Sequence, residues 1–164
     1  MTPPPRPAQN TDQLLELLHD AGAEFVIIGG VAAIIHGATT MTRDLDIAAP
    51  MTPENIGRIM DARRPYHPKH ATRPDLGEIQ DSIERLSGFR LLLLDTDLGR
   101  LDVLKEVEAV GPVSAIESEE FELLDGKRFR VMTLDQLITV KRALGRPKDK
   151  IVAMELLAVR ERLR

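Results

Sequence analysis

The chain has 164 residues, of which 43% are hydrophobic and 29% are charged, and its formal net charge is −4. This length and composition predict one soluble globular domain, and the lack of cysteine excludes disulfides, thiolate zinc sites and cysteine catalysis. The N-terminus lacks the apolar core of a signal peptide and no apolar run could cross a bilayer, so we expect no membrane association and a cytoplasmic protein.

The first half of the chain predicts helices alternating with strands. Residues 1–9 are proline-rich and should form a disordered tail, followed by one domain over residues 10–164. Capping residues or glycines precede short apolar stripes, which predicts helices at 10–19, 31–36 and 52–62. Buried strands are expected at 25–28 and 45–49. Residues 63–78 lack apolar periodicity, so we predict a long mobile loop there.

The second half predicts two hairpins followed by two helices. A short helix is expected at 79–86. The hairpin strands are expected at 89–94, 100–107, 121–124 and 128–132. A capping threonine, Thr133, should open a helix to about Leu144, and Gly145-Arg-Pro147 should separate it from a last helix. This order indicates an α+β fold, with a mixed β-sheet flanked by helices and two helices at the C-terminus.

Two aspartates open the second predicted strand, in the sequence Thr42-Arg-Asp-Leu-Asp46. Residues two apart on a strand point to the same side, so the carboxylates of Asp44 and Asp46 should project together. Neighbouring carboxylates repel unless a proton or cation lies between them, and Mg²⁺ suits oxygen ligands of this kind. Asp102, in a later apolar strand, would complete a site for two metal ions that clamp a phosphoryl displacement. The alternative is that Asp102 faces solvent on an edge strand.

Gly29 and Gly30 stand between a predicted strand and a predicted helix. Such a turn lets backbone N–H groups approach an anion at a helix N-terminus, which favours phosphate binding. The alternative is a tight turn with no ligand. The sequence matches neither the dinucleotide-binding glycine motif nor a Walker loop.

Together these residues resemble the signature of the DNA polymerase β-like nucleotidyltransferase superfamily: a small-residue turn, paired acids, then a third acid on a nearby strand. The detail is most similar to small bacterial nucleotidyltransferases such as the abortive-infection toxins. The matching positions are Gly29, Gly30, Ala32, His36, Gly37, Thr42, Arg43, Asp44 and Asp46, with a further likeness over residues 137–149. The resemblance spans about residues 25–157. Relatives often have a basic residue shortly before Thr42, where this chain has Thr40.

The resemblance implies a nucleotidyltransferase-like fold and transfer of a nucleoside monophosphate from an NTP, such as ATP, to a hydroxyl. The implied catalytic residues, which would also hold two Mg²⁺ ions or Mn²⁺ in their place, are Asp44, Asp46 and Asp102. The implied nucleotide-binding residues are Gly29, Gly30, Arg43, Lys141 and Asp149, with Lys148 as a lesser candidate. For Lys141, an exposed helix lysine is the alternative reading.

The resemblance leaves the acceptor open among tRNA, a protein and a small molecule, and it suggests a toxin–antitoxin setting. Residues 141–164 carry eight basic and three acidic side chains, a balance of +5, while the rest of the chain is −9. That segment could face a phosphate or an RNA backbone, although a solvated helix face explains it more simply. Two other functions stay open: an inactive antitoxin that retains the fold and binds a partner, and an unrelated α+β domain with scattered acids.

Three histidines are weaker signals. His67 and His70 have the spacing His-x-x-His, but without cysteines or a helical context a zinc site is disfavoured. His36 ends the short predicted helix, where a structural hydrogen bond is favoured over a catalytic role.

Overall fold

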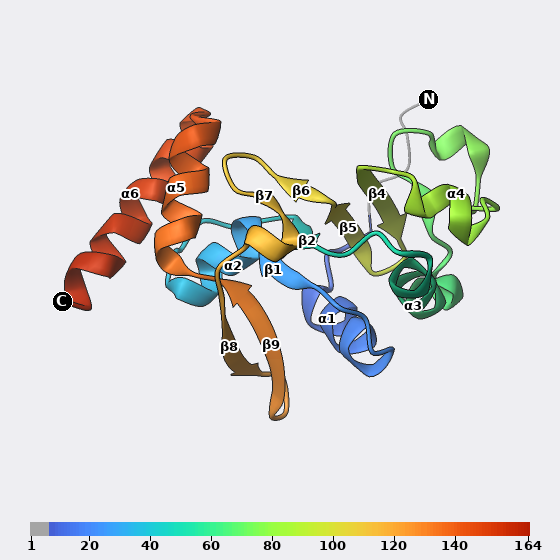
Figure 1. The fold of residues 1–164 in the computed structure, drawn as a ribbon, viewed down its shortest axis with the longest axis horizontal. Helices are drawn as coiled ribbons and strands as arrows, with labels where there is room; N and C mark the ends of the chain where they lie inside the picture. Colours follow the sequence, from blue (N-terminus) through green and yellow to red (C-terminus); the bar gives the residue numbers. More distant parts are fainter. Residues whose placement is uncertain (1–6) are drawn as a thin grey trace.

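A seven-stranded mixed sheet organises the computed structural model, which describes residues 7–164 (Figure 1). Its strands are β1 (Val26–Ile28), β2 (Asp44–Ala48), β3 (Lys69–His70), β4 (Leu91–Thr96), β5 (Gly99–Leu104), β8 (Ser118–Leu123) and β9 (Lys127–Met132). Their order is β3-β4-β5-β2-β1-β9-β8, with β1 parallel to β9, β2 parallel to β5, and the other pairs antiparallel. The predicted α+β fold with a mixed sheet is confirmed.

Six α-helices accompany the sheet in this part of the chain. They are α1 (Thr11–Asp20), α2 (Gly29–His36), α3 (Pro53–Arg63), α4 (Ile83–Ser87), α5 (Leu134–Leu144) and α6 (Pro147–Arg162). The predicted capping side chains of Asn10, Thr52 and Thr133 accept hydrogen bonds from the N–H groups three residues later. As predicted, Gly145 ends α5 in a left-handed conformation, and Pro147 begins α6.

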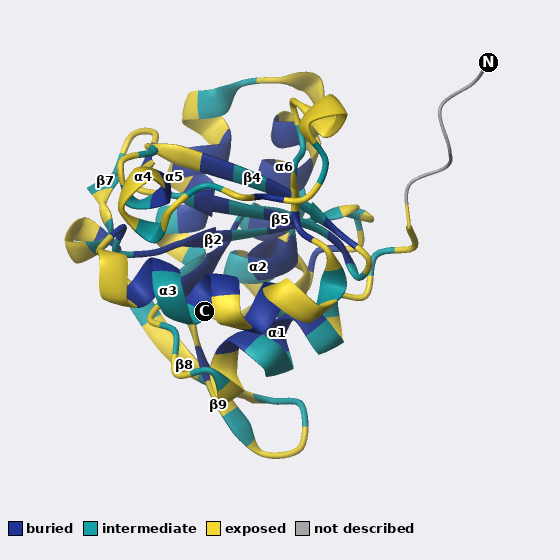
Figure 2. Ribbon diagram, turned by 90° about the vertical axis from the view of Figure 1, so that its right-hand side faces the viewer, coloured by how far each residue is buried: buried dark blue, intermediate teal, exposed yellow. Residues whose placement is uncertain are grey.

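The core lies between one face of the sheet and the layer that contains α1 and α3 (Figure 2). Leu45 and Ile47 of β2 are fully buried, whereas the residues between and before them, Asp46 and Asp44, are partly exposed. Strand alternation therefore sends the aliphatic side chains to the core and the carboxylates to the opposite face. Burying an aliphatic side chain of this size stabilises a fold by roughly 1.5–3 kcal/mol. Because a one-residue slip of β2 would exchange the two faces, the core fixes where the carboxylates point.

Two predictions about loops and strand ends are wrong. Residues 63–78 contain two short 3-10 helices, η1 (Arg64–Tyr66) and η2 (Pro74–Leu76), and the edge strand β3, which pairs with β4. A two-residue strand is too short to give a periodic pattern, so the sequence showed only a loop. The strand expected over 100–107 ends at Leu104, because its partner β4 begins opposite it, at Leu91. The chain then forms a small ribbon of β6 (Glu106–Val107) and β7 (Gly111–Pro112) that was not predicted.

The described part of the N-terminal segment is held against β5. Residues 1–6 of the predicted tail lie outside the described residues, while the Gln9 side chain exchanges two hydrogen bonds with the backbone of Arg100. None of the helices within residues 7–164 is both long and apolar enough to span a membrane. At one end of the molecule α5 and α6 pack together, and at the other end lie α3 and α4 (Figure 1).

Candidate active site

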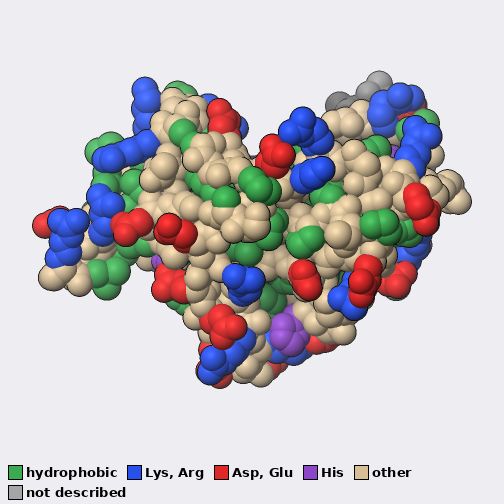
Figure 3. Space-filling view, in the orientation of Figure 1, with side chains coloured by type: hydrophobic (Ala, Val, Ile, Leu, Met, Phe, Trp, Pro, Cys, Tyr) green, Lys and Arg blue, Asp and Glu red, His purple; other side chains and the backbone are tan. Residues whose placement is uncertain are grey.

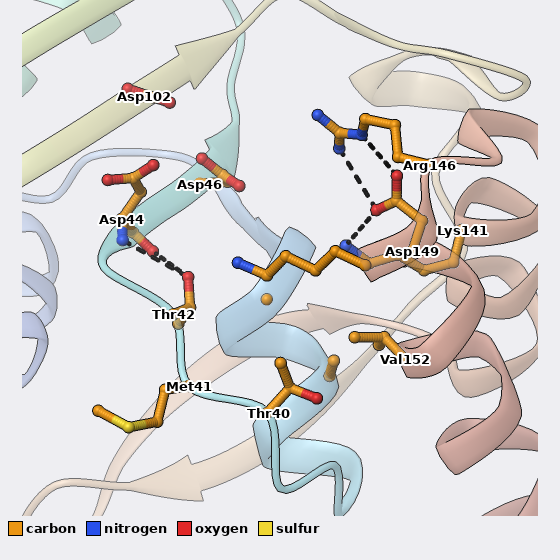
Figure 4. A pocket seen from close by; sticks show the side chains of 13 residues that line it. Thr40, Met41, Thr42, Asp44, Asp46, Asp102, Lys141, Arg146, Asp149 and Val152 are labelled. Carbon is orange, nitrogen blue, oxygen red and sulfur yellow. Dashed lines mark hydrogen bonds and ion pairs between the residues drawn. The ribbon is translucent and has the colours of Figure 1, made fainter.

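Three aspartates lie side by side on the face of the sheet that points away from the core (Figure 4). The register of the parallel strands β2 and β5 places Asp46 directly opposite Asp102, and the antiparallel pairing with β1 places Asp46 opposite Ile28. Asp44 lies two residues before Asp46 and so shares its face. The structure therefore brings together the three carboxylates predicted from sequence, and an edge-strand position for Asp102 is excluded because β5 is paired on both sides.

The pKa values of Asp46 and Asp102 are both raised in this cluster. Burial raises the pKa of Asp46 to about 7, and the negative charges of Asp102 and Asp44 add to the effect. Burial also raises the pKa of Asp102, although the hydrogen bond and charge of Arg100 oppose the shift. The charge of Asp44 thus makes both Asp46 and Asp102 harder to ionise, and Asp102 does the same to Asp46, so a cation beside these carboxylates would favour their charged forms.

The positive charge of Arg100 already offsets part of the negative charge of the three aspartates. Its Nε atom donates a 2.6 Å hydrogen bond to Oδ1 of Asp102. Within residues 7–164 no group of three or more Asp, Glu or His side chains is arranged as it stands to hold a metal ion. The donors themselves are all carboxylate oxygens, which fit a hard divalent cation such as Mg²⁺.

The two glycines are required by the side chains that pack against them. Gly29 has φ +65°, and a Cβ there would meet the carboxylate of Asp46, whose own Cβ would be only 3.1 Å away. A Cβ on Gly30 would lie 2.8 Å from Cβ of Thr42. Any side chain at either position would therefore push away the loop and strand that carry the aspartates. The Gly-Gly pair makes room for the acid cluster, in addition to placing the N-terminus of α2 beside it.

The loop between α2 and β2 is held from both ends. Oγ1 of Thr42 donates to the backbone carbonyl of Asp44 at 3.2 Å and accepts from its N–H at 3.4 Å. Farther back, Glu155 of α6 accepts three hydrogen bonds: from the N–H of Thr39 at 2.7 Å, from its hydroxyl at 2.8 Å and from the Thr40 hydroxyl at 2.5 Å. Thr39 and Thr40 thus tie the loop to α6.

An ion-pair cluster built on the buried carboxylate of Asp149 faces the aspartates from α5 and α6. Asp149 is 2% exposed, and its carboxylate accepts hydrogen bonds from Arg146 at 2.6 and 3.3 Å and from Nζ of Lys141 at 3.5 Å. Burial alone would raise the pKa of Asp149, but the Arg146 hydrogen bond and the charges of both bases hold it below its usual value. Lys141 is 9% exposed, so the alternative of an exposed helix lysine is wrong. Asp149 thus holds the positively charged side chains of Lys141 and Arg146 opposite the three carboxylates (Figure 4).

A polar cavity of about 330 Å³ lies between the two charged clusters. Seven of the site residues predicted from the sequence line this cavity: Gly30, Asp44, Asp46, Asp102, Lys141, Lys148 and Asp149. Gly29 lines a neighbouring cavity, which shares Asp46 and Asp102 with the first. Arg43 is exposed, lies in the bend just before β2 and lines neither cavity. Arg43 is therefore not brought into the site.

Two arginines near the aspartates were not predicted from the sequence as site residues. Arg146 lines both cavities, and Arg100 lines the second. Arg146 was treated only as part of the break between two helices, although its spacing of three residues before Asp149 is typical of a helical ion pair. Arg100 lies two residues before Asp102 in a strand, so the two share a face. That spacing could have indicated the pair.

Other sequence signals lie away from this site. Nε2 of His36 is 2.8 Å from the backbone carbonyl of Met132, and its ring packs edge-on against Phe121, which fits the expected structural role. His67 pairs with Asp97 and His70 with Asp81. No residue of 63–78 lines either cavity. Of the eight basic residues in 141–164, three line the polar cavity, namely Lys141, Arg146 and Lys148.

Comparison with known proteins gives the fold a precedent. No family model matches the chain, and no curated protein matches it in sequence. Among solved structures, it is similar to ANT(2″)-Ia, solved in complex with adenylyl-2″-tobramycin, with 14% identity, a TM-score of 0.52, and coverage of 93% of this chain and 95% of that one. It is also similar to TM1012 from Thermotoga maritima, described as a nucleotidyltransferase, with 15% identity, a TM-score of 0.53, and coverage of 89% and 91%. The chain therefore has the fold found in these nucleotidyltransferases.

Proposed function

We propose that the chain is a Mg²⁺-dependent nucleotidyltransferase that moves a nucleoside monophosphate from an NTP, such as ATP, to a hydroxyl group. The observation that carries the proposal is the in-register pair Asp46 and Asp102, with Asp44 beside it, across a polar cavity from Lys141 and Arg146. A carboxylate cluster facing a cation cluster suits a metal-bound triphosphate, whose metal end and phosphate end need opposite charges.

The proposed role of each residue follows from the charge of its side chain. Bound Mg²⁺, held by Asp44, Asp46 and Asp102, would lower the pKa of the acceptor hydroxyl and offset phosphate charge. Lys141 and Arg146 would balance the remaining charge of the triphosphate, and Asp149 keeps both in place.

The proposed reaction forms one phosphorus–oxygen bond and breaks another. The acceptor hydroxyl oxygen forms a bond to the α-phosphorus, while the bond from that phosphorus to the oxygen bridging to the β-phosphate breaks. Pyrophosphate leaves with the electron pair of the broken bond, and the hydroxyl proton passes to water or to the carboxylate cluster. The protein's contribution is to align these groups and to hold fixed charges where negative charge shifts.

The experiment incubates the protein with ATP labelled at the α-phosphate, Mg²⁺, total tRNA, cell protein and a small-molecule extract. We expect label in one acceptor pool with the wild type and none with Asp44→Asn. Exposed Asp61 of α3 supplies a control, Asp61→Asn, which should transfer normally. If no pool is labelled and Asp44→Asn and wild type bind ATP equally with and without Mg²⁺, the proposal fails.

A second candidate function is a non-catalytic binding protein, and the ion pair between Arg100 and Asp102 favours it. That pair engages Oδ1 of the third carboxylate, so Asp102 already has a cationic partner from the protein itself. Arg100→Gln discriminates between the two functions. If the ion pair blocks a metal site, the substitution creates Mg²⁺ binding that the wild type lacks; a working enzyme already binds Mg²⁺ before the change.

The biological setting is proposed on the resemblance of residues 25–157 to abortive-infection toxins. A cytoplasmic toxin of this kind would arrest growth when expressed in a bacterium, and Asp46→Ala would relieve the arrest. Growth that is unaffected by the wild-type chain would instead favour the antitoxin role.

A further inference from the structure

Three leucines share the open face of the sheet with the three aspartates. Leu91 and Leu93 lie two residues apart in β4, and the register places Leu91 opposite Leu104 and Leu93 opposite Asp102. Leu91 is 50% exposed, whereas Leu92, on the core face of the same strand, is fully buried. Exposing leucines on a sheet face costs solvation free energy that the core does not recover. The aspartates are thus followed across the sheet by apolar surface.

A second cavity, of about 550 Å³, lies over these leucines. Its opposite wall is the apolar side of α5, formed by Leu137, Val140 and Leu144. We call this cavity, between Leu91, Leu93 and Leu104 on the sheet and these three residues on α5, the acceptor groove. Its volume lies in the range of pockets that enclose small organic ligands, about 300–1,000 Å³. In outline, the molecule shows a notch between the half with α5 and α6 and the half with α3 and α4 (Figure 3).

The acceptor groove and the polar cavity meet at the carboxylates. Asp46 and Asp102 line both, as do Lys141 and Arg146. A phosphate chain in the polar cavity and an apolar molecule in the groove would therefore approach each other at Asp102. Direct transfer between two bound substrates needs this arrangement, since the reacting atoms must come within about 3–3.5 Å.

The charges around the groove do not suit a polyanion. The acids lining it are Asp46, Asp102, Glu106 and Glu108, and the bases are Arg100, Lys141 and Arg146. All three bases already form ion pairs with carboxylates, at Asp102 and Asp149. An RNA strand needs several basic side chains to neutralise its phosphates. The groove offers only these three, and the proposed function assigns Lys141 and Arg146 to the triphosphate. Glu106 pairs with Arg90 on the exposed surface at 3.1 Å, and exposed Glu108 adds a further negative charge that favours a cationic or uncharged ligand.

We propose that the acceptor groove binds a small hydroxyl-bearing organic molecule with an apolar body, uncharged or positively charged, and presents its hydroxyl at Asp102. This inference rests on the proposed nucleotidyltransferase function and names the acceptor class for it. The leucines bind the apolar body, and the acids exclude anionic competitors, nucleic acids included.

Three phenols that differ mainly in charge provide the test: uncharged 4-ethylphenol, cationic tyramine and anionic 4-hydroxyphenylacetate. Binding is followed by the methyl signals of leucine-labelled protein in NMR titrations. We expect 4-ethylphenol and tyramine to shift the signals of Leu91, Leu93 and Leu104, and 4-hydroxyphenylacetate to bind at least fivefold more weakly. Leu93→Asn should weaken the first two about tenfold, because apolar contact is lost. Leu163→Asn, at a leucine 75% exposed on the end of α6, is the matched control and should change nothing.

The outcomes separate this inference from the function on which it rests. Binding of ATP with Mg²⁺ is measured on the same samples, which also shows that Leu93→Asn is folded. If ATP binds with Mg²⁺ but the anionic phenol binds as well as the others, or total tRNA displaces the phenols, or Leu93→Asn changes nothing, the acceptor class is wrong and the proposed function stands. If the phenols bind as expected but ATP does not, the groove is an apolar binding site and the proposed function fails.

Discussion

Replacing Asp46 by asparagine should stabilise the protein in the absence of divalent cations. The side chain keeps its shape but loses the charge that faces Asp102 and Asp44. The pKa of Asp46 is about 7 against a usual 3.8, a difference of about 3 pH units. At about 1.36 kcal/mol per unit, the charged form costs the fold about 4 kcal/mol at most. Because the neighbouring carboxylates can relax when one charge is removed, we expect a gain of about 2–4 kcal/mol.

The pH dependence has a definite sign. A carboxyl group whose pKa is raised on folding binds its proton more tightly in the folded state, so wild-type stability falls as pH rises from about 4 to 7. Above pH 7 the loss from this group is complete. The advantage of Asp46→Asn is therefore largest at pH 8 and shrinks as pH falls from 7 toward 4.

The assay is thermal and urea unfolding in EDTA at pH 8, repeated with Mg²⁺. For a domain of this size we expect the Tm of Asp46→Asn to rise by about 5–15 °C in EDTA. Mg²⁺ at 10–100 times its Kd should stabilise the wild type by about 1.4–2.7 kcal/mol and leave the variant unchanged. Asp61→Asn on the exposed side of α3 controls for loss of one negative charge. A variant that is no more stable than the wild type in EDTA at pH 8 would refute the cost, from burial and from the neighbouring charges, of ionising Asp46.

Three further substitutions test the supports of the site. Gly29→Ala should cost about 2 kcal/mol or more in urea unfolding, because it strains a positive φ and drives a Cβ against Asp46; an unchanged midpoint would contradict this. Asp149→Asn should cost about 2–3 kcal/mol at pH 7, since it strands the charge of Lys141. The lowered pKa of Asp149 adds stability above pH 4 that is lost in acid, so the variant should show a flatter acid limb, and parallel limbs would count against the ion pair. Glu155→Ala should weaken NTP binding several-fold with little loss of Tm, because it releases the loop at Thr39 and Thr40 while the core stays intact; equal NTP affinity would show that the loop needs no such anchor.

Local signals in the sequence predicted the elements that position the site. Caps such as Thr52 and Thr133 marked helix starts, and Asp-x-Asp after the glycines located the carboxylates, because strand alternation is a local rule. Tertiary contacts decided what the sequence could not show. Whether β5 lies beside β2 depends on packing far along the chain, and the choice placed Asp102 opposite Asp46 instead of at an edge.

The same distinction explains the residues that were missed or misplaced. Arg146 stands in a sequence that reads as a helix break. Its spacing of three residues pairs it with Asp149, and the packing of α5 against α6 brings this pair to Lys141. The groove leucines looked like ordinary strand residues, since sequence does not reveal which sheet face lacks a covering helix. Arg43 stands in the bend before β2, where strand alternation does not decide which way a side chain points, so the sequence could not show that it lines neither cavity.

Calorimetric titration of a non-hydrolysable ATP analogue, with Mg²⁺ and with EDTA, tests the central claim most directly. The carboxylate cluster and its facing cations predict binding by the wild type that requires Mg²⁺ and is lost in Asp44→Asn, with Asp61→Asn binding as the wild type does. Equal affinity in Mg²⁺ and EDTA, or undiminished affinity in Asp44→Asn, would contradict it.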